Sequence, residues 1–445
     1  MTDPADTCWT RREILRSAAG AAAAALPRWF IEGSPRALAQ VTSPNERPRV
    51  ALVGCGGMGT FDAKFAERFG DIVAICDVDE GRLASAREHF KGARVYDDYR
   101  EVCDLPDLDI VINGTPDHWH TLVNLRAIRS GKDVYSEKPL TLTIDEGKRL
   151  VAAVKESGRV LQTGSQQRSD KTFRLACELV RNGRVGKIER VRVWLPTGLR
   201  EGPFAKQPVP DGLDWDFWQG QTQTVDYMPE RCHQKFRYWW DYSGGTMTDW
   251  GAHHNDIALW GLGKDRSGPV SIEGVATAEP IPGGYTAASA YRVKYVYDDG
   301  VEHFCTSTSA NGWAGAVLGE PLPGEKYHGI QFEGPAGWIY VSREGKLEAS
   351  DPALISAPLP SDSGRLYASD DHMGNFFECV TSRKAPIADV EVGHRSASLC
   401  HLGVIALRLG RKLAWDPQAE TFPDDAEAAG MIAREMRAPY AYESA

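Results

Sequence analysis

The sequence predicts an α/β protein in which a doubly wound parallel sheet is followed by an α+β domain with a large, open, mainly antiparallel sheet. Three observations support this prediction. From residue 49, short β-rich runs alternate with helical stretches, and a glycine-rich loop follows the first run. After about residue 165 the alternation gives way to a long series of strand-like runs. The chain has 445 residues, more than one hydrophobic core usually organises, so we expect two domains.

The overall composition is that of a globular protein with an acidic surface. Hydrophobic residues make up 42% and charged residues 25% of the chain, and the formal net charge is -10. A surface of this sign repels phosphate backbones and anionic lipid, and no run of Lys and Arg makes a local exception. We therefore expect no nucleic-acid partner.

Residues 1–39 differ in kind from the rest. A basic segment around Arg11 and Arg12 precedes an alanine-rich apolar run at 18–26 and the small-x-small sequence Ala37-Leu38-Ala39. This order predicts a signal peptide that resembles the twin-arginine type, a class that carries folded proteins across the membrane. The apolar run is too short to span a bilayer permanently. We expect the twin-arginine export machinery as a partner, cleavage near Ala39, and a periplasmic or other extracytoplasmic location without stable membrane insertion.

Nine cysteines are scattered singly along the chain. Cys55 lies inside the glycine loop, Cys76 ends a predicted strand, and no C-x-x-C spacing occurs. This placement is typical of buried core thiols, so we expect neither a disulfide framework nor a structural zinc site.

The first domain is predicted at residues 48–165. Its expected strands and helices alternate in the order 50–53, 61–69, 72–76, 80–90, 110–112, 120–129, 134–135, 144–156 and 160–163. Strands separated by helices of this length imply a parallel sheet.

The second domain is predicted at residues 166–420, with a C-terminal tail at 421–445. A helix at 173–181 and a strand at 188–194 lead into an aromatic, Gly/Pro-rich insertion that runs to about residue 240. The runs that follow read as strands of one sheet, and helices return near the end: 271–278, 290–296, 302–308, 330–332, 338–341, 347–349, 371–381 and 394–409.

The glycine loop predicts a dinucleotide site. Gly54 would make the turn after the first strand, Gly56 would let the backbone approach a pyrophosphate, and Gly59 would let the helix pack on the strand. We count Met58 of the same loop among the cofactor contacts. Asp77, at the end of the second strand, would bind the adenosine ribose and repel a 2′-phosphate, which favours NAD over NADP. The alternative is a glycine-rich turn in some other α/β domain.

Further candidate residues follow later strands of the same sheet. Ligands of open parallel sheets bind beyond the carboxyl ends of the strands, so the loops after 110–112, 134–135 and 160–163 face this crevice. Pro139 fixes the turn that holds Lys138, which makes this lysine a candidate proton donor or acceptor. The expected cofactor contacts are Thr115, Pro116, His120, Glu137 and Gln166, and the expected substrate contacts here are Trp119 and Gln167. Singly, such a His is more often a packed residue and a Glu-Lys pair more often solvated surface.

Together with the segment Gly244-Gly245-Thr246-Met247-Thr248-Asp249-Trp250-Gly251-Ala252-His253-His254-Asn255-Asp256, these motifs resemble the Gfo/Idh/MocA oxidoreductases, which include glucose-fructose oxidoreductases and inositol dehydrogenases. The resemblance covers about residues 48–415. It implies a Rossmann domain beside an α/β domain whose open sheet mediates homo-dimers or tetramers. It also implies that Lys138, Asp249 and His253 form the catalytic set, with His253 taking the proton as hydride leaves the substrate carbon.

The residues themselves support part of this assignment. On one helix, Asp249, His253 and Asp256 would share a face, and a carboxylate one turn away could orient the imidazole and raise its basicity. Alternatively, Asp249 is an N-cap and His253 a satisfied core histidine. A metal site that adds His254 is a third possibility, but adjacent histidines point to different faces of a helix, so we predict no metal.

The insertion is rich in aromatic residues and predicts sugar binding. Aromatic faces match the C–H faces of sugar rings, while His and Gln side chains match the hydroxyls. We expect His233, Tyr242 and His254 to contact the substrate. The alternative is that most of the rings fill a core beneath the insertion.

These expectations combine into one functional prediction: an exported NAD-dependent oxidoreductase that acts on a hydroxyl of a sugar, polyol or glycoside. Soluble NAD is scarce outside the cytoplasm, so we expect the cofactor to stay tightly bound. One alternative is an NAD-dependent glycosidase or lyase that oxidises a ring hydroxyl transiently. The other is a sugar sensor that keeps the pocket for binding alone.

Overall fold

The computed structural model describes residue 27 and residues 47–276, 279–307, 316–317, 320–321 and 328–443. Except for residue 27, the predicted signal peptide at 1–39 lies outside the described residues. Within the described part, no helix is long and apolar enough to cross a membrane.

The first domain is a parallel sheet, as predicted, with the unpredicted β3 as its sixth strand. The strand order, β3-β2-β1-β4-β5-β6, reverses direction between β1 and β4. The strands are β1 (Arg49–Val53), β2 (Asp71–Cys76), β3 (Arg94–Tyr96), β4 (Ile110–Asn113), β5 (Asp133–Ser136) and β6 (Leu161–Thr163). The connecting helices are α3 (Gly57–Ala66), α4 (Glu80–His89), α5 (Tyr99–Cys103), α6 (His120–Arg129) and α7 (Ile144–Ser157). This order places a ligand crevice beyond the carboxyl ends of β1 and β4.

Local sequence explains where these helices begin and end. Helix α7 starts with a capping box in which the Thr143 side chain accepts from Glu146 N and the Glu146 side chain accepts from Thr143 N. It stops at Gly158, whose φ of 65° is left-handed. The sequence did not predict β3 and α5, because three and five residues are too few for a clear hydrophobic period.

The second domain contains one eight-stranded, mainly antiparallel sheet, also as predicted. The strand order is β15-β14-β13-β7-β10-β9-β8-β16, and only β7 and β10 pair in parallel. The strands are β7 (Arg190–Leu195), β8 (Ser271–Ala276), β9 (Tyr291–Val296), β10 (Glu302–Ser307), β13 (Gly329–Gly334), β14 (Gly337–Ser342), β15 (Lys346–Ala349) and β16 (Leu413–Ala414). Strands β11 (Ala316–Val317) and β12 (Glu320–Pro321) form a separate hairpin.

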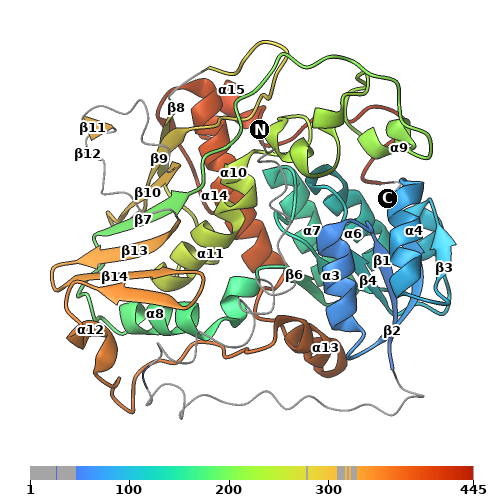
Figure 1. Ribbon diagram of the computed structural model, residues 1–445. Helices are drawn as coiled ribbons and strands as arrows, with labels where there is room; N and C mark the ends of the chain where they lie inside the picture. Colours follow the sequence, from blue (N-terminus) through green and yellow to red (C-terminus); the bar gives the residue numbers. More distant parts are fainter. Residues whose placement is uncertain are drawn as a thin grey trace, which may run out of the picture.

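Helices cover one face of this sheet and also return to the first domain (Figure 1). Helices α8 (Lys171–Arg181), α11 (Gly251–Leu262) and α14 (Val390–Leu409) pack on the sheet in one apolar core, with α12 (Ala353–Ser356) at its edge. Helix α13 (His372–Ser382) lies against α3, where Phe377 stacks on Phe69 with ring centroids 5.2 Å apart. The second half of the chain therefore completes the core of the first domain.

The aromatic insertion folds on itself between β7 and helix α10 (Thr246–Asp249). It contains helix α9 (Trp215–Gln219) and the 3-10 turns Pro229–Arg231 and His233–Tyr238. Its side chains form a buried, mainly aromatic cluster, which Tyr285 joins from the segment between β8 and β9: Leu213, Trp215, Trp218, Tyr227, Cys232, Phe236, Trp239, Tyr242 and Tyr285.

The C-terminal segment, predicted as a tail, packs across both domains. It contains helix α15 (Ala426–Ala429), and Phe422 and Ala428 are part of the core of the second domain. Arg437 N then donates to Gln221 O in the insertion, and the Tyr442 hydroxyl donates to Glu146 in the first domain. The segment thus joins the second domain, the insertion and the first domain.

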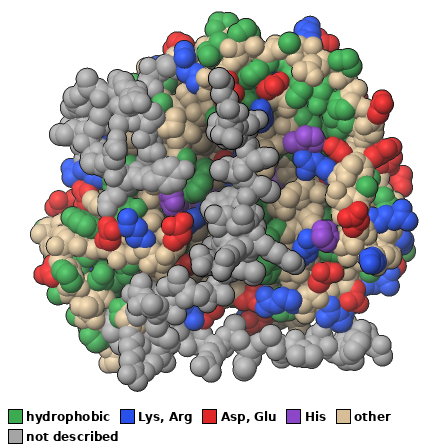
Figure 2. All heavy atoms as spheres, viewed as in Figure 1, with side chains coloured by type: hydrophobic (Ala, Val, Ile, Leu, Met, Phe, Trp, Pro, Cys, Tyr) green, Lys and Arg blue, Asp and Glu red, His purple; other side chains and the backbone are tan. Residues whose placement is uncertain are grey.

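The described cysteines are eight in number, and all are free and buried. This matches the expectation of core thiols for these eight positions. On the face shown in Figure 2, acidic and basic side chains are intermixed around the edges of the molecule.

Candidate active site

The glycine loop between β1 and α3 is shaped to receive a diphosphate. Gly54 has a φ of 89°, and a Cβ there would collide with the backbone of Gly114 at 2.5 Å. A Cβ on Gly59 would collide with the carbonyl of Gly54, so the helix packs closely on the strand. Gly56 is the N-cap of α3, where no side chain caps the free N–H groups, and a Cβ on Gly57 would meet nothing within 4 Å. An uncapped helix N-terminus with open space beside it fits the pyrophosphate of NAD.

Asp77 lies at the carboxyl end of β2, beside this loop. Its carboxylate accepts from Cys55 N at 2.7 Å and from Asp79 N at 3.1 Å. Burial raises the pKa of Asp77 to about 6, although Arg82 and the two backbone N–H groups oppose the rise. Met58 projects from the loop with 47% of its surface exposed, so its side chain is accessible to a bound dinucleotide.

His233 lies at this same end of the crevice, although the sequence analysis expected it at the substrate. Arg82 Nε donates to His233 Nδ1 at 3.0 Å, and His233 Nε2 lies 3.5 Å from Asp79. Arg82 Nη1 in turn lies 2.7 Å from the position of a Cβ on Gly56. The insertion therefore reaches the adenosine side of the dinucleotide loop, a contact between distant segments that no local pattern predicts.

The loop after β4 is held by buried hydrogen bonds. The Thr115 hydroxyl donates to Asn113 Oδ1 at 2.6 Å, and Pro116 is the N-cap of the 3-10 turn Asp117–Trp119. The ring nitrogens of His120 lie 2.7 Å from Pro139 O and 2.8 Å from Thr115 O. His120 is buried and both nitrogens face backbone carbonyls, so it joins two loops instead of contacting the cofactor as expected.

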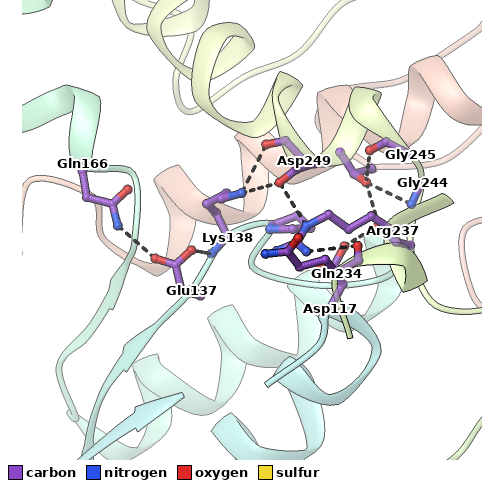
Figure 3. A network of polar contacts seen from close by, with 12 residues as sticks. Asp117, Glu137, Lys138, Gln166, Gln234, Arg237, Gly244, Gly245 and Asp249 are labelled. Carbon is purple, nitrogen blue, oxygen red and sulfur yellow. Dashed lines mark hydrogen bonds and ion pairs between the residues drawn. The ribbon is translucent and has the colours of Figure 1, made fainter. Parts of the chain in front are cut away.

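Lys138 and Asp249 form an ion pair at the centre of the crevice (Figure 3). Lys138 Nζ donates to Asp249 Oδ1 at 2.6 Å, and Arg237 Nε lies 3.3 Å from the same oxygen. Burial alone would raise the pKa of Asp249, but Lys138 and Arg237 outweigh it and hold this pKa well below its usual range. Asp249 is therefore a carboxylate at neutral pH.

Glu137 precedes Lys138, and its carboxylate is directed toward Gln166 (Figure 3). Gln166 Nε2 donates to Glu137 Oε1 at 2.9 Å, so these two predicted cofactor residues are in contact. The buried Asp62 of α3 interacts with Glu137, and burial followed by the Glu137 charge raises the pKa of Asp62 well above its usual value. No sequence motif marks Asp62, because it lies within α3, after the glycine loop has ended.

His253 follows on α11, one helix after Asp249 on α10. Its Nδ1 is buried and has no hydrogen-bond partner. Burial, then Arg343 and Lys138, lower the pKa of His253 well below 6.5. The expected rise in basicity is therefore wrong, because the Asp249 carboxylate bonds to Lys138 and Arg237. The imidazole is neutral and able to accept a proton.

Asp256 does not join this group. Its carboxylate forms a buried ion pair with Arg168, at 2.7 Å from Nε and 2.8 Å from Nη2, and accepts from the Ser396 hydroxyl at 2.6 Å. No group of three or more His, Cys, Asp or Glu residues in the described part of the chain could hold a metal ion.

Gln167 and His254 lie beside Arg343, which follows β14. With its amide oriented to satisfy its neighbours, Gln167 donates to His253 O and accepts from Arg343 Nε, both at 3.0 Å. His254 is buried and its ring stacks on His328 with centroids 5.2 Å apart. These two predicted substrate residues thus support the wall of the site behind His253.

Trp119 and Tyr242 are placed elsewhere. Both rings are buried, and the Trp119 Nε1–H donates to Trp218 O at 2.9 Å. Tyr242 packs edge-on against Trp218 with ring centroids 5.0 Å apart. Tyr242 belongs to the core beneath the insertion, as the alternative interpretation has it, whereas Trp119 belongs to the core of the first domain.

The structure thus brings Lys138, Asp249 and His253 together at the edge of the sheet that carries the glycine loop. Two cations that were not predicted, Arg237 and Arg343, lie with them. Arg237 comes from the insertion and Arg343 from a turn some ninety residues after α10. Neither lies in a motif, so only the fold could reveal them.

Solved structures with the same fold have low sequence identity to this chain. One is the WlbA dehydrogenase from Bordetella pertussis in complex with NADH and UDP-GlcNAcA, with a TM-score of 0.61, 20% identity, and coverage of 83% of this chain and 99% of that one. Another is levoglucosan dehydrogenase in complex with NADH, with a TM-score of 0.61, 18% identity, and coverage of 83% and 99%. At these identities the similarity shows a shared fold.

Among curated proteins, the chain is similar to myo-inositol 2-dehydrogenase of Thermotoga maritima, with 28% identity over 38% of this chain and 48% of that protein. It is 33% identical to inositol 2-dehydrogenase 2 of Saccharopolyspora erythraea over 31% of this chain and 42% of the relative. The chain therefore spans about half the length or less of these two relatives. The scyllo-inositol 2-dehydrogenase (NAD(+)) of Bacillus subtilis is 24% identical over 76% of this chain and 88% of its own length.

Two domain models match nearly the whole described chain. Residues 48–165 match the NAD-binding Rossmann fold of an oxidoreductase family, and residues 193–442 match the C-terminal alpha/beta domain of the same family. Their order is that of the two sheets, and their boundaries enclose the glycine loop, Lys138, Asp249 and His253. The chain belongs to the Gfo/Idh/MocA family of oxidoreductases.

Proposed function

We propose that this protein is an exported, NAD-dependent oxidoreductase that acts on a CH–OH group of a sugar, polyol or glycoside and keeps its cofactor bound between turnovers. The observation that carries the proposal is the buried Lys138–Asp249 ion pair beside the neutral His253, at the strand edge that holds the glycine loop. The family match and the names of the inositol dehydrogenases among its relatives support an alcohol as substrate.

Each residue of this group has a definite task in the proposed reaction. The substrate hydroxyl would lie between Lys138 and His253, with Lys138 donating a hydrogen bond to its oxygen. The neutral imidazole of His253 would accept the hydroxyl proton through Nε2, because its Nδ1 is fully buried. Asp249 holds the lysine in place and would accept a hydrogen bond from a neighbouring substrate hydroxyl. Bound NAD would supply the hydride acceptor.

The activity test uses the purified protein with its nicotinamide and a panel of sugars, polyols and glycosides. The expected result is a change in nicotinamide absorbance, with a ketone product found by mass spectrometry. Incorporation of deuterium at the carbon beside the oxidised one, without net oxidation, would instead identify the glycosidase or lyase reaction. Binding of a sugar without either reaction would identify a sensor.

The Lys138→Ala variant tests the role of the ion pair. We expect kcat to fall by about 100-fold or more, as for loss of a positioned acid–base group, while NADH binding changes little. The matched control is Lys64→Ala on the exposed side of α3, where Lys64 contacts His89. Full turnover by the Lys138→Ala variant would refute the proposed mechanism.

Contacts of the insertion with the dinucleotide loop support cofactor retention. Residues 212–214 bond to the β2–α4 loop through Glu80 N to Gly212 O at 2.9 Å and Asp214 N to Val78 O at 3.0 Å. His233 closes the same edge through Arg82, with a left-handed φ of 53° that its contacts must hold in place. NAD would have to displace or pass these contacts in order to leave.

The His233→Ala variant tests this retention. We expect NADH to dissociate roughly tenfold faster, the effect of losing about 1.4 kcal/mol of closing contacts. Stopped-flow fluorescence of displaced NADH measures the rate, and His89→Ala on the outside of α4 is the control. Rapid loss of nicotinamide from the wild-type protein on dialysis would contradict retention itself.

Export is proposed from the N-terminal sequence alone, namely Arg11-Arg12, the apolar run at 18–26 and Ala37-Leu38-Ala39. Free, buried thiols at the eight described cysteines are compatible with folding before export. Fusion of residues 1–45 to a reporter that is active only after folded export tests it. Replacing Arg11 and Arg12 together by Lys is expected to abolish the signal.

We also propose a homo-oligomer that forms through the sheet face opposite to α8, α11 and α14. The described side chains on that face include a ladder of paired charges, in which Arg192 Nε lies 2.6 Å from Glu333 and Arg190 Nη1 lies 3.3 Å from it. A large sheet with helices on one face commonly covers its second face.

A further inference from the structure

Arg343 lies at the active site but takes no part in the ion pairs described above. It follows β14, and its guanidinium carbon lies 4.7 Å from the centre of the Trp250 ring, next in sequence to Asp249. Its Nε donates to Gln167, which in the same orientation donates to the carbonyl of His253. Arg343 is therefore fixed on two sides, by a ring and by an amide, within the wall that carries His253.

Among the described residues, no carboxylate pairs with this guanidinium as one normally does with a half-buried cation. Within the described part of the chain, no Asp or Glu forms an ion pair with Arg343, and no acceptor bonds to its two Nη nitrogens. The nearest catalytic carboxylate, Asp249, is already shared between Lys138 and Arg237. By contrast, the buried Arg168 is matched by Asp256 and Asp265.

The charges of Asp249, Glu344 and Glu137 stabilise the Arg343 guanidinium only in part, because burial still lowers its pKa. The Arg343 charge in turn contributes to the lowered pKa values of His253 and His254. A guanidinium presents its Nη donors as a planar fork that matches the two oxygens of a carboxylate. Held by Trp250 and Gln167, this fork is preorganised for an anion that comes from outside the chain.

We infer that Arg343 binds the carboxylate of the substrate, so that the preferred substrates are sugar acids: polyhydroxylated monocarboxylates such as aldonic or uronic acids. The inference rests on the proposed function, since it places the reacting hydroxyl at Lys138 and His253 and the carboxylate at Arg343. With a neutral sugar bound, the two Nη nitrogens of Arg343 would donate to water. With the corresponding sugar acid bound, they would donate to its carboxylate. Arg343 would therefore be a specificity-determining residue.

The test compares matched substrates with the purified, NAD-loaded enzyme. Each pair consists of a neutral sugar and its acid, such as glucose with glucuronate and galactose with galacturonate, and one phosphorylated sugar is included. We expect the wild-type enzyme to have a higher kcat/KM for the acid of at least one pair. The Arg343→Gln variant is expected to raise KM for that acid on the order of 10- to 100-fold, and to raise KM for the neutral sugar by a much smaller factor.

Two further variants keep the result interpretable. Arg343→Lys retains the charge but not the fork, and is expected to lose less of the preference than Arg343→Gln. Arg94→Gln removes a surface arginine that pairs with Asp107, and it should leave the KM values for both substrates unchanged. Thermal unfolding confirms that each variant is folded. If Arg343→Gln does not fold, Arg343→Lys is used in its place to test the carboxylate contact.

A binding measurement separates the failure of this inference from the failure of the proposed function. With NADH bound, the acid should raise the unfolding temperature of the wild-type protein but not that of Arg343→Gln. Equal losses for acid and neutral sugar in Arg343→Gln, or a wild-type preference for neutral or phosphorylated sugars, would overturn the inference while leaving the oxidoreductase intact. Absence of turnover with every sugar, together with binding of the acid through Arg343, would overturn only the proposed activity.

Discussion

The Asp77 carboxylate predicts a specific pH dependence of cofactor binding. Its pKa is raised to about 6 by burial, so it begins to take up a proton just below neutral pH. A carboxylate accepts hydrogen bonds from ribose hydroxyls better than the protonated acid does, so bound NAD favours the charged form. We expect NADH affinity to be full above pH 7 and to fall as the pH drops through 6, by up to about tenfold per unit.

Fluorescence titration of NADH between pH 5 and 8 measures this dependence. Asp77→Asn cannot titrate, so it should bind more weakly and with a flat profile. The sign for stability is opposite in the absence of NAD. The folded pKa of about 6 lies above the unfolded value of about 3.9. Asp77 therefore makes the free protein less stable as the pH rises from about 4 to about 6. A wild-type NADH affinity that is constant from pH 5 to 8 would contradict the assignment.

At the scale of single residues, the sequence predicted well where a motif fixes the backbone. Gly54, Gly59, Asp77 and Lys138 lie where the loops after parallel strands place them. It predicted poorly where a side chain's surroundings come from a distant segment. His233 forms a hydrogen bond with Arg82, and His120 forms hydrogen bonds with two backbone carbonyls. Neither contact follows from spacing along the chain.

At the scale of elements, helix α11 is anchored by one buried ion pair. Asp256 on α11 meets Arg168 of the 3-10 turn Gln166–Ser169, and both side chains are at most 2% exposed. Replacing Asp256 leaves the buried Arg168 with Asp265, 3.2 Å from its Nη1, as the remaining partner, so the cost is at the low end of the about 3–5 kcal/mol for breaking a buried ion pair. We therefore expect Asp256→Asn to lower the free energy of unfolding by about 3 kcal/mol.

Urea unfolding followed by tryptophan fluorescence measures the change. The control, Asp104→Asn, removes the partner of Arg126 in an exposed pair and should cost less than about 1 kcal/mol. If Asp256→Asn is as stable as wild type, the pair does not anchor α11. If the free energy of unfolding falls as expected, Asp256 stabilises the fold and does not take part in proton transfer.

The expected elements agree closely with the structure where an element is long and its period clear. Helices α7 and α14 and the paired strands of the large sheet follow from hydrophobic periodicity. Short elements escaped because too few residues show a period: β3, α5 and the two-residue β16. The C-terminal segment looked like a tail because its contacts are single aromatic and arginine side chains.

At the scale of the whole molecule, the paired charges on the outer sheet face predict how oligomers would respond to mutation. Glu333→Arg would place a third cation beside Arg190 and Arg192. If this face joins subunits, the variant should have the mass of a monomer where the wild type has that of a dimer or tetramer. Light scattering after size exclusion measures both.

The matched control is Glu88→Arg, which makes the same charge change on the exposed side of α4. It should leave the oligomer intact. A wild-type protein that is monomeric at micromolar concentration would contradict the proposal. An oligomer that survives Glu333→Arg would move the interface to another face.

The insertion between β7 and α10 carries His233 to the adenosine edge and, four residues later, Arg237 to Asp249. One short turn therefore contributes to both ends of the crevice. If this segment were exchanged between relatives, the rate of cofactor release and the substrate specificity would change together. If residues 233–237 are mutated in the laboratory to change the substrate, the selected enzymes should also exchange nicotinamide at a different rate.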